Sequence, residues 1–157
     1  MDEIVIYNTQ FVDSLENFMK ILAMALAEKD IRVLVSGTFD NIVYKTILDK
    51  ILNSSHIRDC KIIIPLVTSS GVISRSYINK ICNNGGNIRI NSQFRKNIVV
   101  IGNKAFVLSF SGKYNKQYGI KTHFECCIQT DEVEVVEKIC ESFMIGWQDS
   151  LPLVNES

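Results

Sequence analysis

The sequence predicts an α/β fold, an α+β sandwich in which a mixed, mostly parallel β-sheet is flanked by helices. Short apolar segments and amphipathic helical segments alternate three times, and strand segments then follow one another without helices between them. The apolar runs are unbroken, as is typical of strands that are buried on both faces of a sheet. We expect residues 1–157 to form a single domain.

The first part of the chain supplies the alternating elements. Segments 4–7, 31–37 and 60–66 are predicted strands. The helix predicted after the first strand would bury one face, made of Phe11, Leu15, Phe18, Leu22, Ala25 and Leu26. The helix predicted at 39–54 would bury Val43, Ile47, Leu48 and Ile51.

The second part of the chain begins with a helix within 70–86, which ends at the stop signal Asn84-Gly85-Gly86. Predicted strands at 87–90, 97–101, 104–110 and 123–130 follow, and Gly102-Asn103 forms a tight turn between the second and third of them. We expect the polar segment 111–122 to be a loop and 133–147 to be the closing helix. The predicted core includes Ile62, Ile63, Ile64, Val99, Ile101, Val107 and Phe124.

Charge is distributed unevenly along a chain whose formal net charge is zero. Residues 60–124 contain ten Lys or Arg and no Asp or Glu, whereas the flanking segments carry net charges of −3 and −7. The ten cations are Lys61, Arg75, Lys80, Arg89, Arg95, Lys96, Lys104, Lys113, Lys116 and Lys121. One interpretation is a positive surface for a phosphate-bearing partner. The alternative is that buried strands explain part of the run and that the acidic ends fold back to neutralise it.

The cysteines and histidines favour neither a disulfide framework nor a metal site. The cysteine count is odd, no CxxC spacing occurs, and the two histidines have no ligand spacing to the cysteines. We therefore expect reduced, buried thiols in a cytoplasmic protein and no cofactor. No segment is long and apolar enough for a membrane span, and the acidic N-terminus is unlike a signal peptide.

Residues 85–111, GGNIRINSQFRKNIVVIGNKAFVLSFS, resemble the signature region of the phospholipase D superfamily. In that family the pattern runs from a glycine through a short strand to H-x-K-x4-D, and then through a second strand to a G-S-x-N turn. The opening IVIYNTQF and the closing FMIGWQDSLP also look like the small members that carry one motif. The resemblance implies a phospholipase D-like fold and a phosphodiesterase ancestry for most of the chain.

Carried over residue by residue, the resemblance implies that the catalytic motif is degenerate. The nucleophilic histidine of the family falls on Arg95, its phosphate-binding lysine on Asn97 and its aspartate on Gly102. The glycine-serine pair falls on Ser109 and Phe110, and the asparagine on Gly112, whereas a later acid is matched by Glu125. An alternative register that places Lys96 on the lysine needs Phe94 for the histidine and Ile101 for the aspartate, so it fits less well.

The residues themselves agree with a loss of catalysis. Arg95 stays protonated and cannot attack phosphorus. His123 precedes Glu125 by two strand positions, so alternation would place both on one face and make them weak catalytic candidates. The alternative is that His123 is partly buried or structural. We expect His56 to be a surface or capping residue.

What remains would be an anion site. Arg95 and Asn97 are two positions apart on one strand, and Ser109 and Ser111 share a face of the next. Arg95 could grip a phosphate with its guanidinium fork, or instead form an internal salt bridge with Glu125. Three lysines are further binding candidates, Lys96, Lys104 and Lys113.

Three functions compete at this point. The first is a catalytically degenerate domain that binds a phosphate-bearing ligand or nucleic acid in a regulatory or scaffolding role. The second is a phosphodiesterase or nuclease with substituted residues, and the third is a protein-interaction or dimerisation module without a ligand. The resemblance also implies a homodimer whose axis lies near residues 94–97, 109–113 and 123–125, where two copies of Arg95 would approach each other.

Overall fold

Within the described residues, eight strands form a single sheet in the computed structural model. It describes residues 8–37, 42–65, 73–115 and 119–153, with the backbone alone for 112–115 and 119–122. The strands are β1 (Thr9–Val12), β2 (Val33–Ser36), β3 (Cys60–Ile64), β4 (Asn87–Ile90), β5 (Ile98–Ile101), β6 (Lys104–Asn115), β7 (Gly119–Thr130) and β8 (Leu151–Pro152). The α-helices are α1 (Leu15–Leu26), α2 (Ile42–Leu52), α3 (Arg75–Asn83) and α4 (Val133–Gln148).

The strand order is β1-β7-β6-β5-β2-β3-β4-β8. Only the β2–β3 and β3–β4 pairs are parallel, and the other pairs are antiparallel. The prediction of a mixed sheet is confirmed, but the expectation that it is mostly parallel is wrong. Parallel neighbours need a crossover connection, and after β4 the strands β5, β6 and β7 follow each other without a helix.

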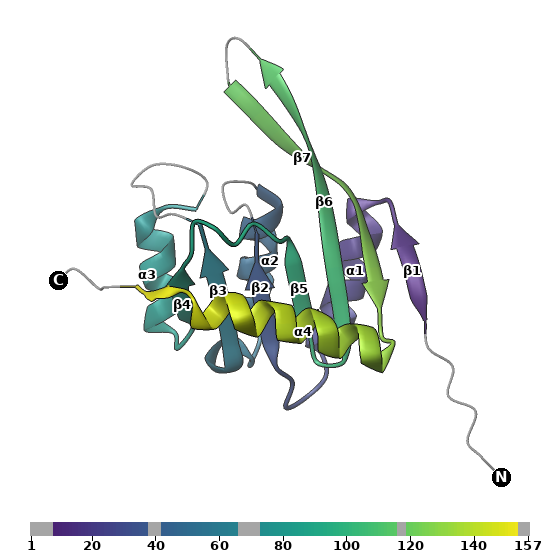
Figure 1. Ribbon diagram of the computed structural model, residues 1–157, viewed down its shortest axis with the longest axis horizontal. Helices are drawn as coiled ribbons and strands as arrows, with labels where there is room; N and C mark the ends of the chain where they lie inside the picture. The colour runs from purple at the N-terminus through teal and green to yellow at the C-terminus, as the bar shows by residue number, and fades with distance from the viewer. Residues whose placement is uncertain (1–7, 38–41, 66–72, 116–118, 154–157) are drawn as a thin grey trace.

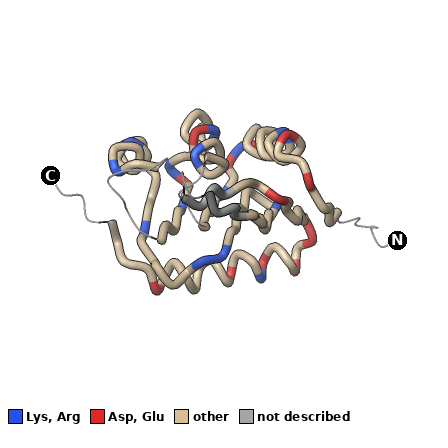
Figure 2. The backbone as a smooth tube through the Cα atoms, turned by 90° about the horizontal axis from the view of Figure 1, so that it is seen from above, with Lys and Arg blue, Asp and Glu red and all other residues tan. Residues whose placement is uncertain are grey.

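The helices cover the two faces of the sheet unequally (Figures 1 and 2). Helices α1, α2 and α3 pack on one face, here called the three-helix face, over buried residues such as Val35, Ile62 and Phe106. Helix α4 alone crosses the opposite face, the α4 face, and packs against Ile63, Val100 and Ala105 among others.

Helix α1 begins later than the spacing of apolar residues predicts. The side chain of Ser14 accepts a hydrogen bond from the backbone N–H of Asn17 at 3.3 Å, so Ser14 is the N-cap. Phe11 therefore belongs to β1, where it is 65% exposed, and not to the buried face of the helix. Leu15 is also exposed, whereas Phe18, Leu22, Ala25 and Leu26 are buried as predicted.

Most of the predicted core residues are buried. Ile62, Ile63, Ile64, Val99 and Ile101 are at most 1% exposed. Phe124 is partly buried on the three-helix face, in the cluster that contains all of them except Ile63. Val107 is the exception, because it is 43% exposed on the α4 face. Val107 is the register partner of Ile128 on β7, and Ile128 is in turn the register partner of Phe11 on β1. Ile128 and Phe11 are also exposed. We call Phe11, Val107 and Ile128 the apolar row.

The expected loop at 111–122 is wrong, because the described backbone on both sides of residues 116–118 is β-strand. β6 pairs with β5 only up to Val107, and β7 pairs with β1 only from Cys127 onward. Beyond these points the two strands pair only with each other and project from the body of the molecule (Figure 1). This two-stranded extension, residues 109–115 and 119–126, is here called the ribbon.

The segment between β4 and β5 is fastened to α4. The Asn91 side-chain amide donates to the Gly146 carbonyl at 3.2 Å, and the Lys96 ammonium donates to the Ser142 hydroxyl at 2.5 Å. A Cβ at position 146 would lie 2.3 Å from the Phe94 ring, so only glycine permits this close approach. Arg89 also reaches α4, where its guanidinium donates to the Trp147 carbonyl and stacks on the indole.

None of the helices in the described ranges is long and apolar enough to cross a bilayer. The strand expected at 4–7 lies outside the described residues.

We expect Phe18→Ala to lower the free energy of unfolding by about 3–5 kcal/mol. Phe18 is fully buried, and its ring centroid lies 5.5 Å from those of Phe106 and Phe124, so truncation leaves a cavity that neither neighbour can fill. Urea denaturation measures the change. The control Met24→Ala, on the same helix but 71% exposed, should change stability by less than about 0.5 kcal/mol. A cost below about 1 kcal/mol for Phe18→Ala would contradict this packing.

Candidate anion-binding site

The candidate site lies where the parallel strand β2 ends beside the beginning of β5. The Tyr44 side chain, from α2, is fully buried here. Its hydroxyl donates to the Ser36 carbonyl at 2.7 Å and lies 3.1 Å from Oδ1 of Asn97. The Ser36 hydroxyl in turn donates to the Lys96 carbonyl at 2.8 Å. The loop that carries Arg95 is thereby tied to the end of β2.

Gly37 makes this contact possible. A Cβ at this position would lie 1.9 Å from the Tyr44 hydroxyl oxygen and 2.5 Å from Oδ1 of Asn97. The backbone φ of +154° also belongs to a region that side chains rarely adopt. The glycine that ends the predicted strand 31–37 is therefore a packing requirement for Tyr44 and Asn97.

The polar contact at the end of β2 is electrically neutral. Burial raises the pKa of the Tyr44 phenol well above its ordinary value, so the hydroxyl keeps its proton and acts as a donor. Asn97 is half-buried, and its side chain is engaged with Tyr44. The chemistry available here is hydrogen bonding, because neither group is a nucleophile at neutral pH.

Tyr44 is the residue that the sequence analysis missed. Its position was available from helical spacing, since Tyr44 precedes the predicted core residues Ile47, Leu48 and Ile51 by three, four and seven positions. A tyrosine in such a stripe needs a partner for its hydroxyl, and the strand-ending glycine is the place that offers one.

Arg95 lies two residues before Asn97 and is exposed. Among the described residues, the ion pairs join Lys20 to Glu16, Arg32 to Glu137 and Lys45 to Asp49. The internal salt bridge considered between Arg95 and Glu125 is therefore not formed in this structure, where both side chains are exposed.

The base of the ribbon contains a β-bulge that changes the expected facing of Glu125. Ser109 pairs with Cys126 and Phe110 with Phe124, so Glu125 has no register partner. Simple alternation therefore does not place Glu125 on one face with His123. Ser109 and Ser111 are both exposed, and Ser111 is the register partner of His123.

Aromatic rings fill the three-helix face at the base of the ribbon. The Phe110 ring lies 5.6 Å from Tyr44 and 6.3 Å from Phe124, measured between centroids. Phe124 in turn stacks on Phe18 at 5.5 Å. This aromatic cluster surrounds the neutral Tyr44 contact with apolar surface.

The two histidines differ in burial. His123 is exposed, so it is not the partly buried residue that one interpretation expected. His56 is 4% exposed, so it is not a surface residue, but it is the N-cap residue of the short 3-10 helix Ile57–Asp59, as the capping alternative expected. Its Nε2 lies 3.1 Å from the Leu26 carbonyl at the end of α1. In the described part of the chain, no cluster of His, Cys, Asp or Glu could hold a metal ion.

The described Lys and Arg residues are spread over several elements and do not gather on one face of the backbone (Figure 2). Lys96 turns to the α4 face, as strand alternation predicts, and Arg89 is engaged with α4. Lys104 follows the Gly102-Asn103 turn at the opposite end of β5 from Arg95. The described site thus brings Arg95, Asn97 and the base of the ribbon together but leaves Lys104 apart.

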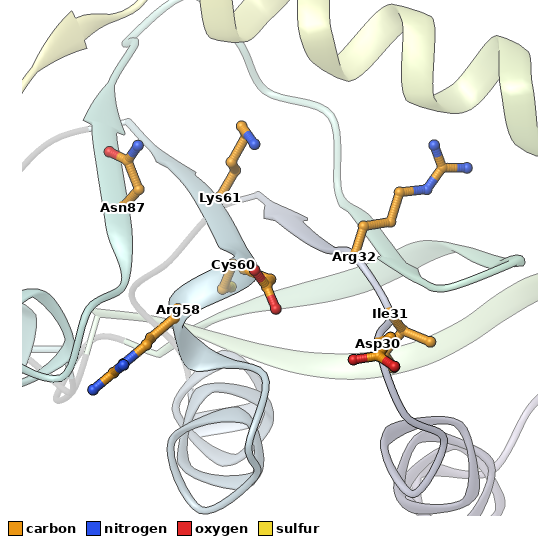
Figure 3. Close-up of a pocket in the computed structure, with 8 residues that line it drawn as sticks. Asp30, Ile31, Arg32, Arg58, Cys60, Lys61 and Asn87 are labelled. Atoms are coloured by element: carbon orange, nitrogen blue, oxygen red, sulfur yellow. The ribbon is translucent and has the colours of Figure 1, made fainter.

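A pocket of about 500 Å³ lies at the opposite end of the parallel strands, where β2, β3 and β4 begin (Figure 3). Its charged side chains diverge: Arg58 points away from the cavity, and Arg32 extends toward α4, where it pairs with Glu137. Cys60 lines this pocket, and burial raises the pKa of its thiol to about 12. With diverging cations and a protonated thiol, this pocket offers no convergent set of groups for a ligand.

We expect Tyr44→Phe to lower the free energy of unfolding at pH 7 by about 1–3 kcal/mol, because the Ser36 carbonyl and Asn97 lose a buried donor. The folded pKa of Tyr44 is raised, so its contribution is complete below an ordinary tyrosine pKa of about 10 and declines as pH rises above it. Urea denaturation at pH 7 and 10.5 should therefore show a smaller difference between the two proteins at the higher pH. An unchanged difference would contradict a buried, neutral Tyr44.

No protein-family model and no curated protein matches this sequence, whereas solved structures do match its fold. The chain superposes on Nuc from Salmonella typhimurium, a phospholipase D family member, with a TM-score of 0.62 and 18% identity over 94% of this chain and 99% of that one. NucT from Helicobacter pylori gives a TM-score of 0.65 at 12% identity, over 94% of this chain and 100% of that one.

TrmBL2, described as an archaeal chromatin protein with a novel mode of DNA binding, gives a TM-score of 0.58 at 12% identity. The match covers 96% of this chain and 56% of TrmBL2, so this chain corresponds to a little over half of that protein. At these identities the likeness concerns the fold. The chain therefore has the fold of the phospholipase D family members, as the resemblance of its sequence implied.

Proposed function

We propose that this chain is a non-catalytic phospholipase D-like domain that binds a phosphate-bearing ligand, with nucleic acid as the preferred class, in a regulatory or scaffolding role. The observation that carries the proposal is Arg95: an exposed guanidinium without an ion-pair partner among the described residues, on a loop fixed beside β2. A planar fork of this kind matches the oxygens of a phosphate.

The loss of catalysis is supported by what occupies the family's positions. Where the resemblance implies a nucleophile, an arginine stands, and where it implies a phosphate-binding lysine, Asn97 contacts Tyr44. Where it implies an aspartate, Gly102 sits in a turn with a φ of +60°. A side chain at this φ is disfavoured, so the turn supports glycine in a structural role.

Nucleic acid is favoured over a small phosphorylated molecule for two reasons. TrmBL2, a DNA-binding chromatin protein by its description, shares the fold. The described cavities also lack a convergent cationic pocket, whereas Arg95 and the ribbon are open to a large partner. The ligand candidates in this proposal are Arg95, Asn97, Ser109 and Ser111, with Lys113 on the ribbon. A cytoplasmic location belongs to the same proposal, and the free cysteines support it.

We also propose that the protein is a homodimer whose contact adjoins the base of the ribbon. The apolar row supports this, because its three side chains are 42–65% exposed on one part of the α4 face that α4 leaves open. Adjacent exposed apolar side chains on a sheet face are typical of a surface that another chain covers. Val107 is two positions from Ser109, so the row continues into the residues that the resemblance places near the axis.

Arg95→Ala should weaken binding of a 20-base-pair DNA duplex by about 1–3 kcal/mol, the range for a hydrogen bond to a charged group whose partner is removed. Fluorescence anisotropy at low salt measures the affinity. Arg58→Ala is the matched control, since Arg58 is also an exposed arginine but lies at the opposite end of the parallel strands, where β3 begins. Equal affinities for all three proteins would refute the role of Arg95.

The same preparations should not hydrolyse bis-nitrophenyl phosphate or plasmid DNA above background. Turnover that survives purification and disappears in His123→Ala would move the protein to the enzyme class.

In sedimentation velocity at about 10 µM, we expect the wild-type protein to be a dimer and Ile128→Lys a monomer, because a charge in the apolar row must be desolvated on association. Met24→Lys, at an exposed apolar position on helix α1, should remain a dimer. A wild-type protein that stays monomeric with and without phosphate would reject the dimer.

A further inference from the structure

We propose that the ribbon is a double-stranded DNA-binding arm that enters the major groove, with Arg95 holding the phosphate backbone at its base. This inference rests on the proposed function and assigns it an element and a partner. Strands β6 and β7 are each 12 residues long, whereas their neighbours in the sheet, β5 and β1, are only four residues long.

Beyond residues 108 and 127 no described strand flanks the pair on either side. An isolated two-stranded hairpin is only marginally stable in water. The projection of the ribbon from the sheet (Figure 1) is therefore poorly explained by the needs of folding, since the sheet would close with a short turn.

The charge sequence of the ribbon adds a second observation. From residue 109 to 124 the chain contains lysines and no Asp or Glu. The register makes positions 113 and 121, both lysines, direct partners across the two strands. Like charges at directly opposed positions destabilise a sheet pair. A negatively charged partner would offset the repulsion between the two lysines, so the pair favours binding of a polyanion.

The dimensions of the ribbon fit the major groove of DNA better than that of RNA. Six strand steps from Ser109 to Asn115 reach roughly 20 Å at about 3.3 Å per residue. The major groove of B-form DNA is about 12 Å wide and about 8.5 Å deep, and it admits a two-stranded β-ribbon. The major groove of double-stranded RNA is deep and narrow, so the same ribbon does not enter it.

Arg95 lies at the root of the ribbon. The Leu108 amide donates to the Asn97 carbonyl at 2.9 Å, so the Arg95 loop runs beside the point where β6 leaves the sheet. A duplex that received the ribbon in its groove would pass its phosphate backbone over this loop. Ser109 and Ser111, both exposed, are further neutral donors at the base of the ribbon, on either side of Phe110 in β6.

The central test compares charge variants of the paired lysines. In Lys113→Glu/Lys121→Glu the two opposed residues still carry like charges, so the repulsion between them is preserved. The charge that they present to DNA, however, changes from positive to negative. We expect the affinity for a 20-base-pair duplex to fall at least about 10-fold. The slope of log K against log salt should decrease by about 2, one phosphate per lysine. Lys29→Glu/Lys138→Glu, on exposed lysines outside the acid-free stretch, is the matched control and should bind like the wild type.

The single variant Lys113→Glu separates binding from folding. It creates an opposite-charge pair with Lys121, which should raise or preserve thermal stability while it weakens DNA binding. Increased stability with unchanged affinity would show that the lysine pair has no role in binding and would overturn the inference.

A shortened ribbon gives a second route. Ser111 and His123 are register partners, so replacing residues 112–122 by Asn-Gly closes the hairpin with a two-residue turn. We expect the wild type to bind duplex DNA more tightly than single-stranded DNA, because only the duplex offers a major groove. The shortened variant should keep its melting temperature and lose this preference, and Arg95→Ala should still weaken the DNA binding that remains. The wild type should bind the RNA duplex of the same sequence at least about 10-fold more weakly than the DNA duplex.

The outcomes distinguish the two proposals. If the wild type binds neither duplex nor single-stranded DNA at low salt, the proposed function fails and this inference fails with it. If binding depends on Arg95 but the ribbon variants bind as the wild type does, or if both duplexes bind equally, only the DNA-binding arm is refuted.

Discussion

The antiparallel pairing of β2 with β5 is the constraint on which the rest of the structure depends. It joins the part of the sheet with parallel strands to the part built from β5, β6, β7 and β1, and its register aligns Val33 with Ile101 and Ser36 with Ile98. These strands are buried on both faces, so a shift of one position would exchange the residues that face α4 with those that face the other helices. The turn at Gly102 and the contact of Gly37 with Asn97 lie at its two ends.

The same pairing explains why the site is polar and neutral rather than charged. Ser36 at the end of β2 is buried, and Asn97, directly before β5, is half-buried; an unpaired charge here would be costly. The Tyr44 hydroxyl donates to the Ser36 carbonyl at 2.7 Å, lies 3.1 Å from Oδ1 of Asn97 and keeps its proton. Arg95, two residues further out, is left to the solvent, so the charge lies outside the buried cluster and the hydrogen bonds lie inside it.

Much of the fold could be predicted because its signals are local. Unbroken apolar runs identified β3 and β5, and the double glycine marked the end of α3. The beginning of α1 was misplaced because Phe11 fits the helical spacing, although Ser14 was visible as a capping residue. The pairing partner of a strand is a long-range property, so nothing local showed that β5 pairs with β2. The missing helices after β4 were visible in the sequence and indicate antiparallel neighbours, but the prediction did not use them.

The candidate site was predictable only in part, for the same reason. Arg95 was found from its motif, but Tyr44 comes from another element, and only the folded sheet brings its hydroxyl to Asn97. The polar composition of 111–122 resembles a loop because the alternation that marks a half-buried strand requires a core to face. A strand pair that leaves the sheet has no such face, so its sequence carries no apolar pattern to detect.

The attachment of the loop that carries Arg95 has an entropic consequence. Hydrogen bonds fix this loop to three different elements: to β2 through Ser36, to β6 through Leu108, and to α4 through Asn91. An arginine on an unattached loop would require ordering of several backbone residues when a ligand binds, at about 1–2 kcal/mol each. Here the backbone is already ordered, and only the rotamers of one side chain remain to be fixed. The scaffold thus pre-organises Arg95, so more of its interaction energy with a ligand appears as binding affinity.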